Sequence, residues 1–452
     1  MENREQYKRL IMFFASALIL LVQVAIFYYI WHRYYNYRSV IGALYWRRGN
    51  WALMGVYAFI NFFFSKIFGA YKVGYLKVSD VIASQILAVL CCNGVTYMQL
   101  ALIGRWRFSA YLEPIMQMTL YDVVAVIAWV IFMRWIYAKI YPPRQMLLVY
   151  GDINPKALIQ KMTSRTDKYS IVDMINISEG YDAVIERISH YEAIVIGDIP
   201  SVYRNKFLKY CYANSIRCYS IPKISDIMIK SSTTINLFDT ELMLFRNRGL
   251  TAEQRLLKRA SDIVFSPILL LVAVLIKLYD GGPVFYKQER LTYNHKVFMI
   301  YKFRSMRVDS EKTGAQLAKK NDDRITPVGH VIRSLHIDEL PQLFNILKGD
   351  MAFVGPRPER PEIAELYKKS IPEFDFRLKM KAGLTGYAQV FGKYSTTPYD
   401  KLKLDLTYIE NYTFALDLMI IIQTVKILFQ KENSEGLDTG QKTALRTEDK
   451  KN

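Results

Sequence analysis

Residues 335–362 read LHIDELPQLFNILKGDMAFVGPRPERPE and combine a short amphipathic segment with a proline-bracketed loop. Pro341 suits the first turn of a helix and Gly349 suits its end, so the pattern predicts a helix between them. Asp338 and Glu339 stand just before this helix, where free backbone N–H groups favour an anion. Capping of the helix would explain one carboxylate, at about 1 kcal/mol, but not two. The second carboxylate therefore indicates a role in catalysis or in binding a ligand.

The acid pair and the loop that follows it predict a site for phosphate chemistry. Two adjacent carboxylates suit a divalent cation, Mg²⁺ or Mn²⁺, which binds hard oxygen atoms and substrate phosphates. An aspartate such as Asp338 can also attack phosphorus and form an acyl phosphate. Arg357, held between Pro356 and Pro358, would present its planar guanidinium to phosphate oxygens. We therefore predict Asp338 and Glu339 as catalytic residues and metal ligands, and Arg357 as a phosphate ligand.

The 452 residues are 52% hydrophobic, which exceeds the need of a soluble core and predicts membrane segments. Four apolar runs are long enough to cross about 30 Å of hydrocarbon. They lie near residues 10–31, 51–70, 81–103 and 114–137. Four spans would return the chain to the side on which it starts, and the Lys and Arg residues give only a weak preference for a cytoplasmic N-terminus.

The formal net charge of +19 indicates anionic partners. With apolar runs of this length, lipid headgroups and phosphorylated ligands fit better than nucleic acid, for which no recognition module is visible. The four cysteines show neither a disulfide pattern nor a zinc motif. The composition therefore predicts membrane lipids as partners and no nucleic acid.

After Pro142, short β-rich runs alternate with segments of helical length. The runs are QMLLVYGD, YSIVDMINI, EAIVIGD and SIRCYSIP, which begin at Gln145, Tyr169, Glu192 and Ser215. This alternation predicts a small parallel sheet with covering helices, a Rossmann-like α/β domain over 142–250. Its first turn, VYGDINPKAL, lacks the glycines of a dinucleotide site, so we expect a structural or regulatory role.

A further apolar run between Lys258 and Lys277 could cross the membrane or turn back within it. Ser266 and Pro267 interrupt the run, and positive residues stand at both ends. Because a fifth span would export everything that follows, we predict a re-entrant helix at 260–279, broken at Ser266 and Pro267.

The last apolar run, LDLMIIIQTVKILF from Leu416, is short for a span and contains Gln423 and Lys426. It predicts a helix that either lies on the membrane or packs in a core. The polar tail, 432–452, is predicted to be disordered.

Five motifs together resemble the bacterial polyprenyl-phosphate hexose-1-phosphate transferases. They are KRASDIVFSP, GGPVFYKQER, FMIYKFRSM, TPVGHVIRSLHIDELPQLFNILKGDMAFVGPRPERPE and KAGLTGYAQV, in this order between about 253 and 430. The part ahead of them is matched by architecture only, and looks like the long-form members that initiate capsule, exopolysaccharide or O-antigen units. The resemblance implies a four-helix transmembrane region (1–141), the α/β domain (142–250) and an α+β catalytic domain (251–431). It also implies the bacterial cytoplasmic (inner) membrane, with the catalytic domain on the cytoplasmic face.

The resemblance implies that a UDP-sugar gives its sugar 1-phosphate to undecaprenyl phosphate and releases UMP. By similarity, Asp338 would be the nucleophile that forms a phosphosugar-aspartate, and Glu339 would help to organise a metal or a proton. Arg357 matches the family's phosphate clamp, and Ser266 with Pro267 matches the break of its re-entrant helix. Further phosphate-binding candidates lie in matched motifs, with solvated basic residues or headgroup contacts as the alternative: Lys302, Arg304 and Arg333.

KAGLTGYAQV departs from many relatives, which have Arg-Pro before the glycine and Trp in place of Tyr387, so the sugar, of glucose or galactose type, stays open. One alternative is a non-catalytic membrane scaffold or regulator of polysaccharide synthesis, in which the acids only cap a helix and no UMP is released. A conventional glycosyltransferase would release UDP instead. A homo-oligomer is compatible with the sequence.

Overall fold

The computed structural model describes residues 6–36, 47–103, 108–151, 155–245, 249–264, 285–303, 337–392 and 396–428. The chain divides into two compact units, 1–221 and 222–452. Several predictions fall outside the described residues and stay predictions: those on Ser266, Pro267, Arg304, Arg333 and the tail 432–452.

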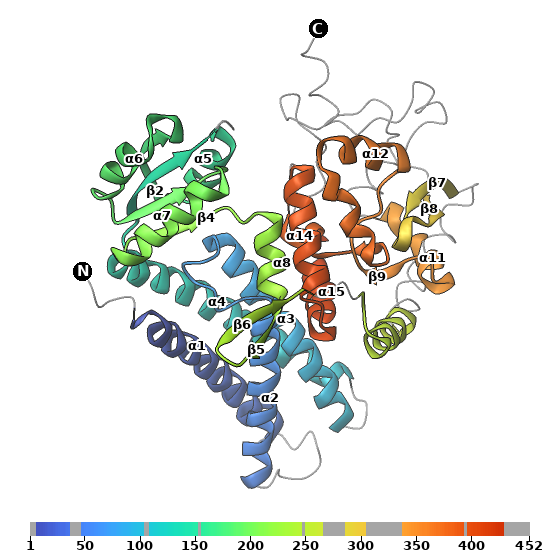
Figure 1. Ribbon diagram of the computed structural model, residues 1–452. Coiled ribbons are helices and arrows are strands. Elements are labelled where there is room, and N and C mark those ends of the chain that lie inside the picture. The colour runs from blue at the N-terminus through green and yellow to red at the C-terminus, as the bar shows by residue number, and fades with distance from the viewer. Residues whose placement is uncertain are drawn as a thin grey trace, which may run out of the picture. The chain divides into compact units, whose positions relative to one another are not determined.

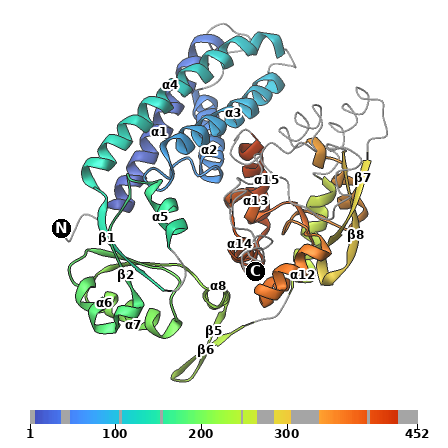
Figure 2. The same cartoon turned by 90° about the horizontal axis from the view of Figure 1, so that it is seen from above.

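The first unit begins with a bundle of four helices (Figures 1 and 2): α1 (Lys8–Ile30), α2 (Arg47–Ile67), α3 (Val78–Ile103) and α4 (Phe108–Ile140). Three described segments are long and apolar enough to cross a membrane: Lys8–Tyr35, Val78–Ile103 and Leu112–Ile140. Helix α2 forms where the second span was expected, but it is not apolar enough over a sufficient length to count as a candidate span. Its apolar stretch is short, because Arg48 and Lys66 bound it and Asn61 interrupts it. The described chain thus holds three candidate spans where the sequence predicted four.

A parallel four-stranded sheet follows the helices, as predicted. Its strands are β1 (Arg144–Tyr150), β2 (Tyr169–Asn176), β3 (Ala193–Ile196) and β4 (Arg217–Ser220), in the order β2-β1-β3-β4. Helix α5 (Lys156–Thr163) packs on one face, and α6 (Tyr181–Ile188) and α7 (Ser201–Ala213) pack on the other. Leu147 and Val149 point to α6 and α7 while Met146 and Leu148 point to α5, as the alternation of a strand requires.

The second unit begins with α8 (Ile224–Ser231) and a hairpin of β5 (Thr233–Leu237) and β6 (Thr240–Leu244). Ile224 and Ile227 of α8 pack in one apolar cluster with Leu402 and Leu406. Helix α8 therefore belongs with this unit although it precedes residue 250. The expected limits of the α/β and catalytic domains stay a prediction.

The remaining elements of the second unit pack in the apolar cluster of α8, which α12 (Pro361–Ser370) joins through Ile363 and Tyr367, and in a second apolar core that contains Leu343, Ile346, Phe353 and Tyr408. A helix covers 252–264, and strands β7 (Phe285–Leu291) and β8 (Val297–Phe303) pair antiparallel. Strands β9 (Ala352–Val354) and β10 (Gly383–Thr385) pair parallel. The other helices are α11 (Gln342–Lys348), α13 (Tyr387–Phe391), α14 (Pro398–Glu410) and α15 (Phe414–Leu428).

Helix α15, formed by the last apolar run, packs in this core. Ile420 is fully buried, and Asp417 lies 2.7 Å from Lys258 Nζ. Of the two predicted positions for this helix, the structure shows the core position. Lys258 is only 5% exposed, so it is not the solvated flanking charge that the sequence suggested. Its charge is balanced inside the protein, and it carries little information about membrane topology.

Candidate active site

Three of the predicted site residues come together in the second unit. Lys302 Nζ lies 2.9 Å from Glu339 Oε1, and Arg357 Nη2 lies 2.5 Å from the same oxygen. Arg357 Nη1 also donates to Glu339 Oε2 at 3.3 Å, so the guanidinium contacts both carboxylate oxygens. The Glu339 side chain is 13% exposed, whereas that of Arg357 is 41% exposed. A covered carboxylate therefore holds two cations, one of which reaches the surface.

The short turn that carries the acid pair is held against strand β8. Asp338 and Glu339 lie in a 3₁₀ turn, η4 (Ile337–Glu339), and Lys302 lies near the end of β8. Asn345 holds the following helix, α11, against the same strand, because its Oδ1 accepts from Tyr301 N at 3.1 Å and its Nδ2 donates to Met299 O at 2.8 Å. Asn345 is fully buried. This amide fixes the strand at the position from which Lys302 meets Glu339.

Helix α11 begins after Pro341 and ends at Gly349, as predicted. Gly349 has a φ of 90°, the left-handed conformation that glycine adopts without strain. The acids precede the helix in a separate turn, and Glu339 is held by side-chain cations rather than acting as its cap. Arg259 holds the other end of the helix, with Nη1 2.6 Å from Ile346 O and Nη2 2.7 Å from Leu347 O.

The loop that carries Arg357 is fixed by its close approach to β10. Gly355 N donates to Thr385 O at 2.8 Å, and Gly383 N donates to Pro356 O at 2.9 Å. A Cβ on Gly383 would lie 2.0 Å from Gly355 N, so no larger residue fits there. The glycines of the two matched motifs are thus needed for one backbone contact.

Two arginines that the sequence did not single out hold the same loop. Arg377 Nη2 donates to the Arg357 carbonyl at 2.8 Å, and Arg290 Nη1 donates to the Pro358 carbonyl at 3.0 Å. Arg377 also contacts Asp405 Oδ2 through Nη2 at 2.7 Å and through Nε at 3.0 Å. The consecutive backbone carbonyls of Arg357 and Pro358 are therefore each bound by a guanidinium.

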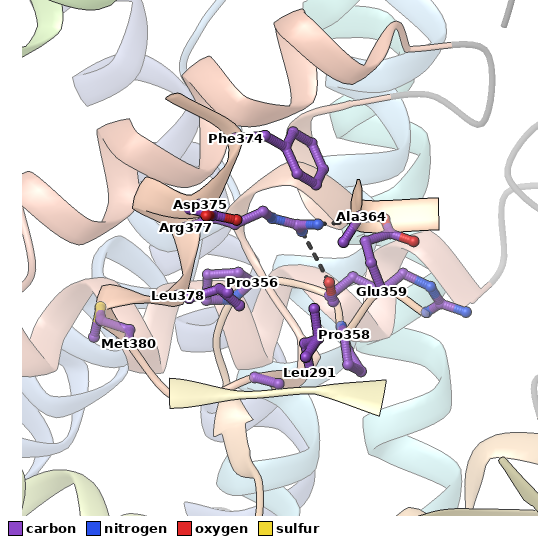
Figure 3. Close-up of a pocket in the computed structure, with 12 residues that line it drawn as sticks. Leu291, Pro356, Pro358, Glu359, Ala364, Phe374, Asp375, Arg377, Leu378 and Met380 are labelled. Atoms are coloured by element: carbon purple, nitrogen blue, oxygen red, sulfur yellow. Dashed lines mark hydrogen bonds and ion pairs between the residues drawn. The ribbon is translucent and has the colours of Figure 1, made fainter. Parts of the chain in front are cut away.

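A small pocket lies behind this loop. Figure 3 shows Arg377 and Glu359 pointing toward each other across it, with Phe374 and Pro358 in its lining. Arg377 Nη1 lies 3.3 Å from Glu359 Oε1, and Lys401 contacts the same oxygen. Arg377 is buried, and its guanidinium lies 5.0 Å from the centroid of the Phe374 ring. The pocket is thus closed by a network of buried charges that supports the loop.

The surroundings of Glu339 keep it ionised. Burial by itself would raise the pKa of Glu339, but the charges of Arg357 and Lys302 and their hydrogen bonds outweigh burial and hold this pKa well below its usual value. The charge of Glu339 raises the pKa of Arg357 despite burial. Burial lowers the pKa of Lys302, and the attraction of Glu339 opposes this shift.

The supporting network carries shifts of the same kind. Burial lowers the pKa of Arg290 to about 10, with repulsion from Arg357 and Arg360 adding to the effect. For Glu359, burial acts to raise the pKa, but Lys401 and Arg377 outweigh it and bring this pKa to about 2. The carboxylates of Glu339 and Glu359 are therefore both anionic at neutral pH.

Asp338 lies beside this cluster, half-buried in η4. Its charge acts on both cations, because it opposes the lowering of the pKa of Lys302 and adds to the raised pKa of Arg357. The structure thus places Asp338, Glu339, Lys302 and Arg357 in one electrostatic environment.

A divalent cation at the acid pair would compete with the contacts that Glu339 already makes. Within the described ranges, no three His, Cys, Asp or Glu side chains are grouped as a metal site. Both Glu339 oxygens already accept from Arg357 or Lys302, so a metal on Glu339 would have to displace one of them. Mg²⁺ often uses one or two carboxylates together with substrate phosphates and water, so the assignment of Asp338 and Glu339 as metal ligands stays a prediction.

Comparison with known proteins places these motifs in one family. The family model described as "Bacterial sugar transferase" matches residues 253–431. A UDP-N-acetylgalactosamine-undecaprenyl-phosphate N-acetylgalactosaminephosphotransferase of Aeromonas hydrophila is 34% identical over 320 residues, covering 68% of this chain and 72% of that protein. An undecaprenyl-phosphate galactose phosphotransferase of Salmonella typhimurium is 34% identical, over 47% and 49% of the two chains. A UDP-glucose:undecaprenyl-phosphate glucose-1-phosphate transferase of Xanthomonas campestris is 42% identical, over 36% of each. The chain therefore belongs to the bacterial polyprenyl-phosphate sugar-1-phosphate transferase family, as its motifs indicated.

Proposed function

We propose that this protein transfers a hexose 1-phosphate from a UDP-sugar to undecaprenyl phosphate, the first step in building a capsule, exopolysaccharide or O-antigen repeat unit. Relatives whose names state this kind of transfer, with N-acetylgalactosamine, galactose or glucose, support the reaction class and leave the sugar open. The observation that carries the proposal is the contact of Lys302 and Arg357 with Glu339, beside Asp338 and inside the matched region. A scaffold whose acids only cap a helix is not favoured, because Glu339 is held by these two cations.

The proposed chemistry is a double displacement at one phosphorus atom. A carboxylate oxygen of Asp338 attacks the phosphorus that bears the sugar, the bond from this phosphorus to the bridging oxygen breaks, and UMP leaves with that oxygen. A phosphosugar-aspartate remains on the enzyme. An oxygen of undecaprenyl phosphate then attacks the same phosphorus, which frees the Asp338 carboxylate and yields the lipid diphosphate sugar.

The basic residues would bind the phosphates and the charge that develops on them. Arg357 is partly exposed, so its guanidinium can contact a ligand while Glu339 holds its orientation. Lys302 is more deeply placed and keeps its charge in contact with Glu339. Arg304 and Arg333 are proposed as further phosphate ligands on the resemblance alone.

We also propose that Mg²⁺ or Mn²⁺ takes part, held by Asp338 together with the phosphates of the substrate. Glu339 would act on the cation through charge, and would bind it directly only if Arg357 or Lys302 moved to the substrate. When bound, the metal ion would screen the negative charge of the diphosphate.

The membrane arrangement is proposed from the helices and the chemistry of the two substrates. With α2 as a fourth span beside the three candidate spans, both ends of the helical region lie on the cytoplasmic side of the inner membrane. The re-entrant helix at 260–279 would set the catalytic domain in one leaflet. A polyprenyl tail stays in the bilayer and a nucleotide sugar stays in water, so a site at the headgroups lets both phosphates meet.

The test uses the full-length enzyme in lipid nanodiscs with a panel of UDP-sugars. With Mg²⁺ and no lipid acceptor, we expect release of at most about one UMP per enzyme and an adduct on the peptide that contains Asp338, detected by mass spectrometry. Asp338→Asn should lower turnover at least about a thousandfold, on the order of 4 kcal/mol. Asp182→Asn, on the exposed surface of α6, is the matched control and should keep normal turnover. Release of UDP would contradict the reaction class, and near-normal turnover of Asp338→Asn would contradict the covalent step.

A further inference from the structure

A polar cluster lies inside the four N-terminal helices and has no part in the proposed reaction. Asp122 of α4 is fully buried, and so is Asn61 of α2, while Asn93 of α3 is 2% exposed. Asp122 lies within the candidate span Leu112–Ile140. Ionisable residues are rare in such segments and usually mark a site that binds or moves something.

Hydrogen bonds join this cluster across three helices. Asn93 Nδ2 donates to Asp122 Oδ2 at 3.1 Å and to Thr119 Oγ1 at 2.9 Å. The Tyr57 hydroxyl donates to Asn93 Oδ1 at 3.4 Å. Asp122 therefore lies in a continuous polar contact between α2, α3 and α4.

Several buried polar atoms beside these bonds have no partner in the described part of the chain. They include Asp122 Oδ1, Asn61 Nδ2, Thr96 Oγ1 and both amide atoms of Gln23. Thr96 lies one helical turn from Asn93. Gln23 lies one turn from Phe27, whose ring stacks on Tyr57 with centroids 4.3 Å apart. The unpaired atoms thus lie on helices that pack around Asp122 and include both donors and acceptors, a mixture that suits bound water.

The charge of Asp122 has no counterpart in its surroundings. No Lys or Arg forms an ion pair with it among the described residues, and its contacts are with Asn93 and Tyr57. Among the titratable groups of the helices packed against it, those that interact with Asp122 are Tyr57 of α2 and Cys92 of α3, neither of them cationic. An ionised carboxylate is strongly disfavoured in such a place, whereas a proton removes the charge and turns the unpaired oxygen into a donor.

We propose that the four helices enclose a hydrated proton-binding site, in which Asp122 carries the proton and bound water connects it to Gln23 and Thr96. The ligands are a proton and water, and the site is independent of the proposed transferase reaction. Proton loss would leave a bare charge between α2, α3 and α4, so the packing of these helices depends on retaining it.

Infrared spectroscopy of the full-length protein in nanodiscs tests the proton directly. At neutral pH, we expect a C=O stretching band of a protonated carboxyl group that shifts in D₂O and is lost in Asp122→Asn. Asp182→Asn, on the exposed surface of α6, should keep the band. The proposal is overturned if the wild-type protein lacks the band, or if the band persists in Asp122→Asn.

Thermal unfolding gives a second readout, followed by the reaction of the buried Cys92 thiol with a fluorescent probe. Asn has nearly the shape of a neutral aspartic acid, so Asp122→Asn should unfold close to the wild-type temperature and Asp122→Leu clearly below it. Raising the pH should lower the unfolding temperature of the wild type and not that of Asp122→Asn, because only the wild type has a proton to lose there. A higher unfolding temperature in Na⁺ at constant ionic strength and pH, seen in the wild type only, would show that a metal ion binds in place of the proton and would overturn the proposal. If both variants fail to fold, the D₂O shift and the pH titration of the wild-type band decide the question.

Discussion

Replacing Arg357 with Lys tests whether this cation acts through Glu339. The guanidinium contacts both Glu339 oxygens, at 2.5 and 3.3 Å, and an ammonium group can keep one of these contacts. A hydrogen bond to a charged group contributes about 1.5–3 kcal/mol, and the 41% exposure of Arg357 reduces this through solvent screening. We therefore expect Arg357→Lys to lose about 1–2 kcal/mol, roughly a 5- to 30-fold decrease in kcat/KM.

A double-mutant cycle separates this contact from other roles of the two residues. Initial rates of UMP release are measured for Arg357→Lys, Glu339→Gln and the double variant of the full-length enzyme. The contact between the guanidinium and the carboxylate is already lost in each single variant, so the double variant loses it only once. The barrier increase of the double variant should therefore be smaller than the sum of the two single increases by about 1–2 kcal/mol. The matched control is the exposed pair Arg187 and Asp173, 2.8 Å apart, where Arg187→Lys and Asp173→Asn should leave the rate unchanged. If both single variants lower the rate and their effects add within about 0.5 kcal/mol, the contact does not contribute to turnover and the reasoning is refuted.

Three further predictions concern the surroundings of the site. Arg377→Lys keeps the charge but loses the paired contacts to Asp405 and the Arg357 carbonyl. It should therefore lower the unfolding temperature and reduce kcat/KM at least about tenfold. An unchanged kcat/KM would show that the loop does not need these contacts of Arg377. Glu359 has a pKa of about 2 in the folded protein against a usual 4.5. Its ionised form therefore stabilises the fold by up to about 3 kcal/mol above pH 5, and this stabilisation is lost as the pH falls toward 2. Denaturant titrations at pH 6 and pH 3.5 should therefore show a smaller loss for Glu359→Gln than for the wild type. Removal of divalent cations with a chelator should abolish UMP release, reversibly on adding Mg²⁺, and leave the unfolding temperature nearly unchanged.

The sequence predicted the parts of the fold that depend on neighbouring residues. The strands of the parallel sheet and the limits of α11 at Pro341 and Gly349 follow from local patterns, and the structure confirms them. Three of the four expected spans are also found, and the second falls short because its polar ends leave too few apolar residues. Local spacing decides these features, because propensity and periodicity act within one or two turns of the chain.

Contacts between distant segments account for what the sequence left out. Arg377 and Asp405 are 28 residues apart and both buried, yet each reads in the sequence as a surface charge. Lys258 and Arg259 look like the positive flank of a membrane segment, but one pairs with Asp417 and the other binds the end of α11. Buried charges are stable only with a partner supplied by another part of the fold, so no pattern along the chain reveals them. The matched motifs did contain most of these residues, without showing what each one contacts.

The charges of the site give a physical reason for the proposed metal ion. With Lys302 and Arg357 counted as cations and Asp338 and the low-pKa Glu339 counted as carboxylates, these four groups together carry no net charge. A diphosphate adds about two negative charges to this neutral group, next to a carboxylate that must approach phosphorus. One divalent cation would restore neutrality. In the proposed reaction, the ion pair of Glu339 would orient Arg357 toward the ligand, and a divalent cation would offset the diphosphate charge that these four groups leave unbalanced.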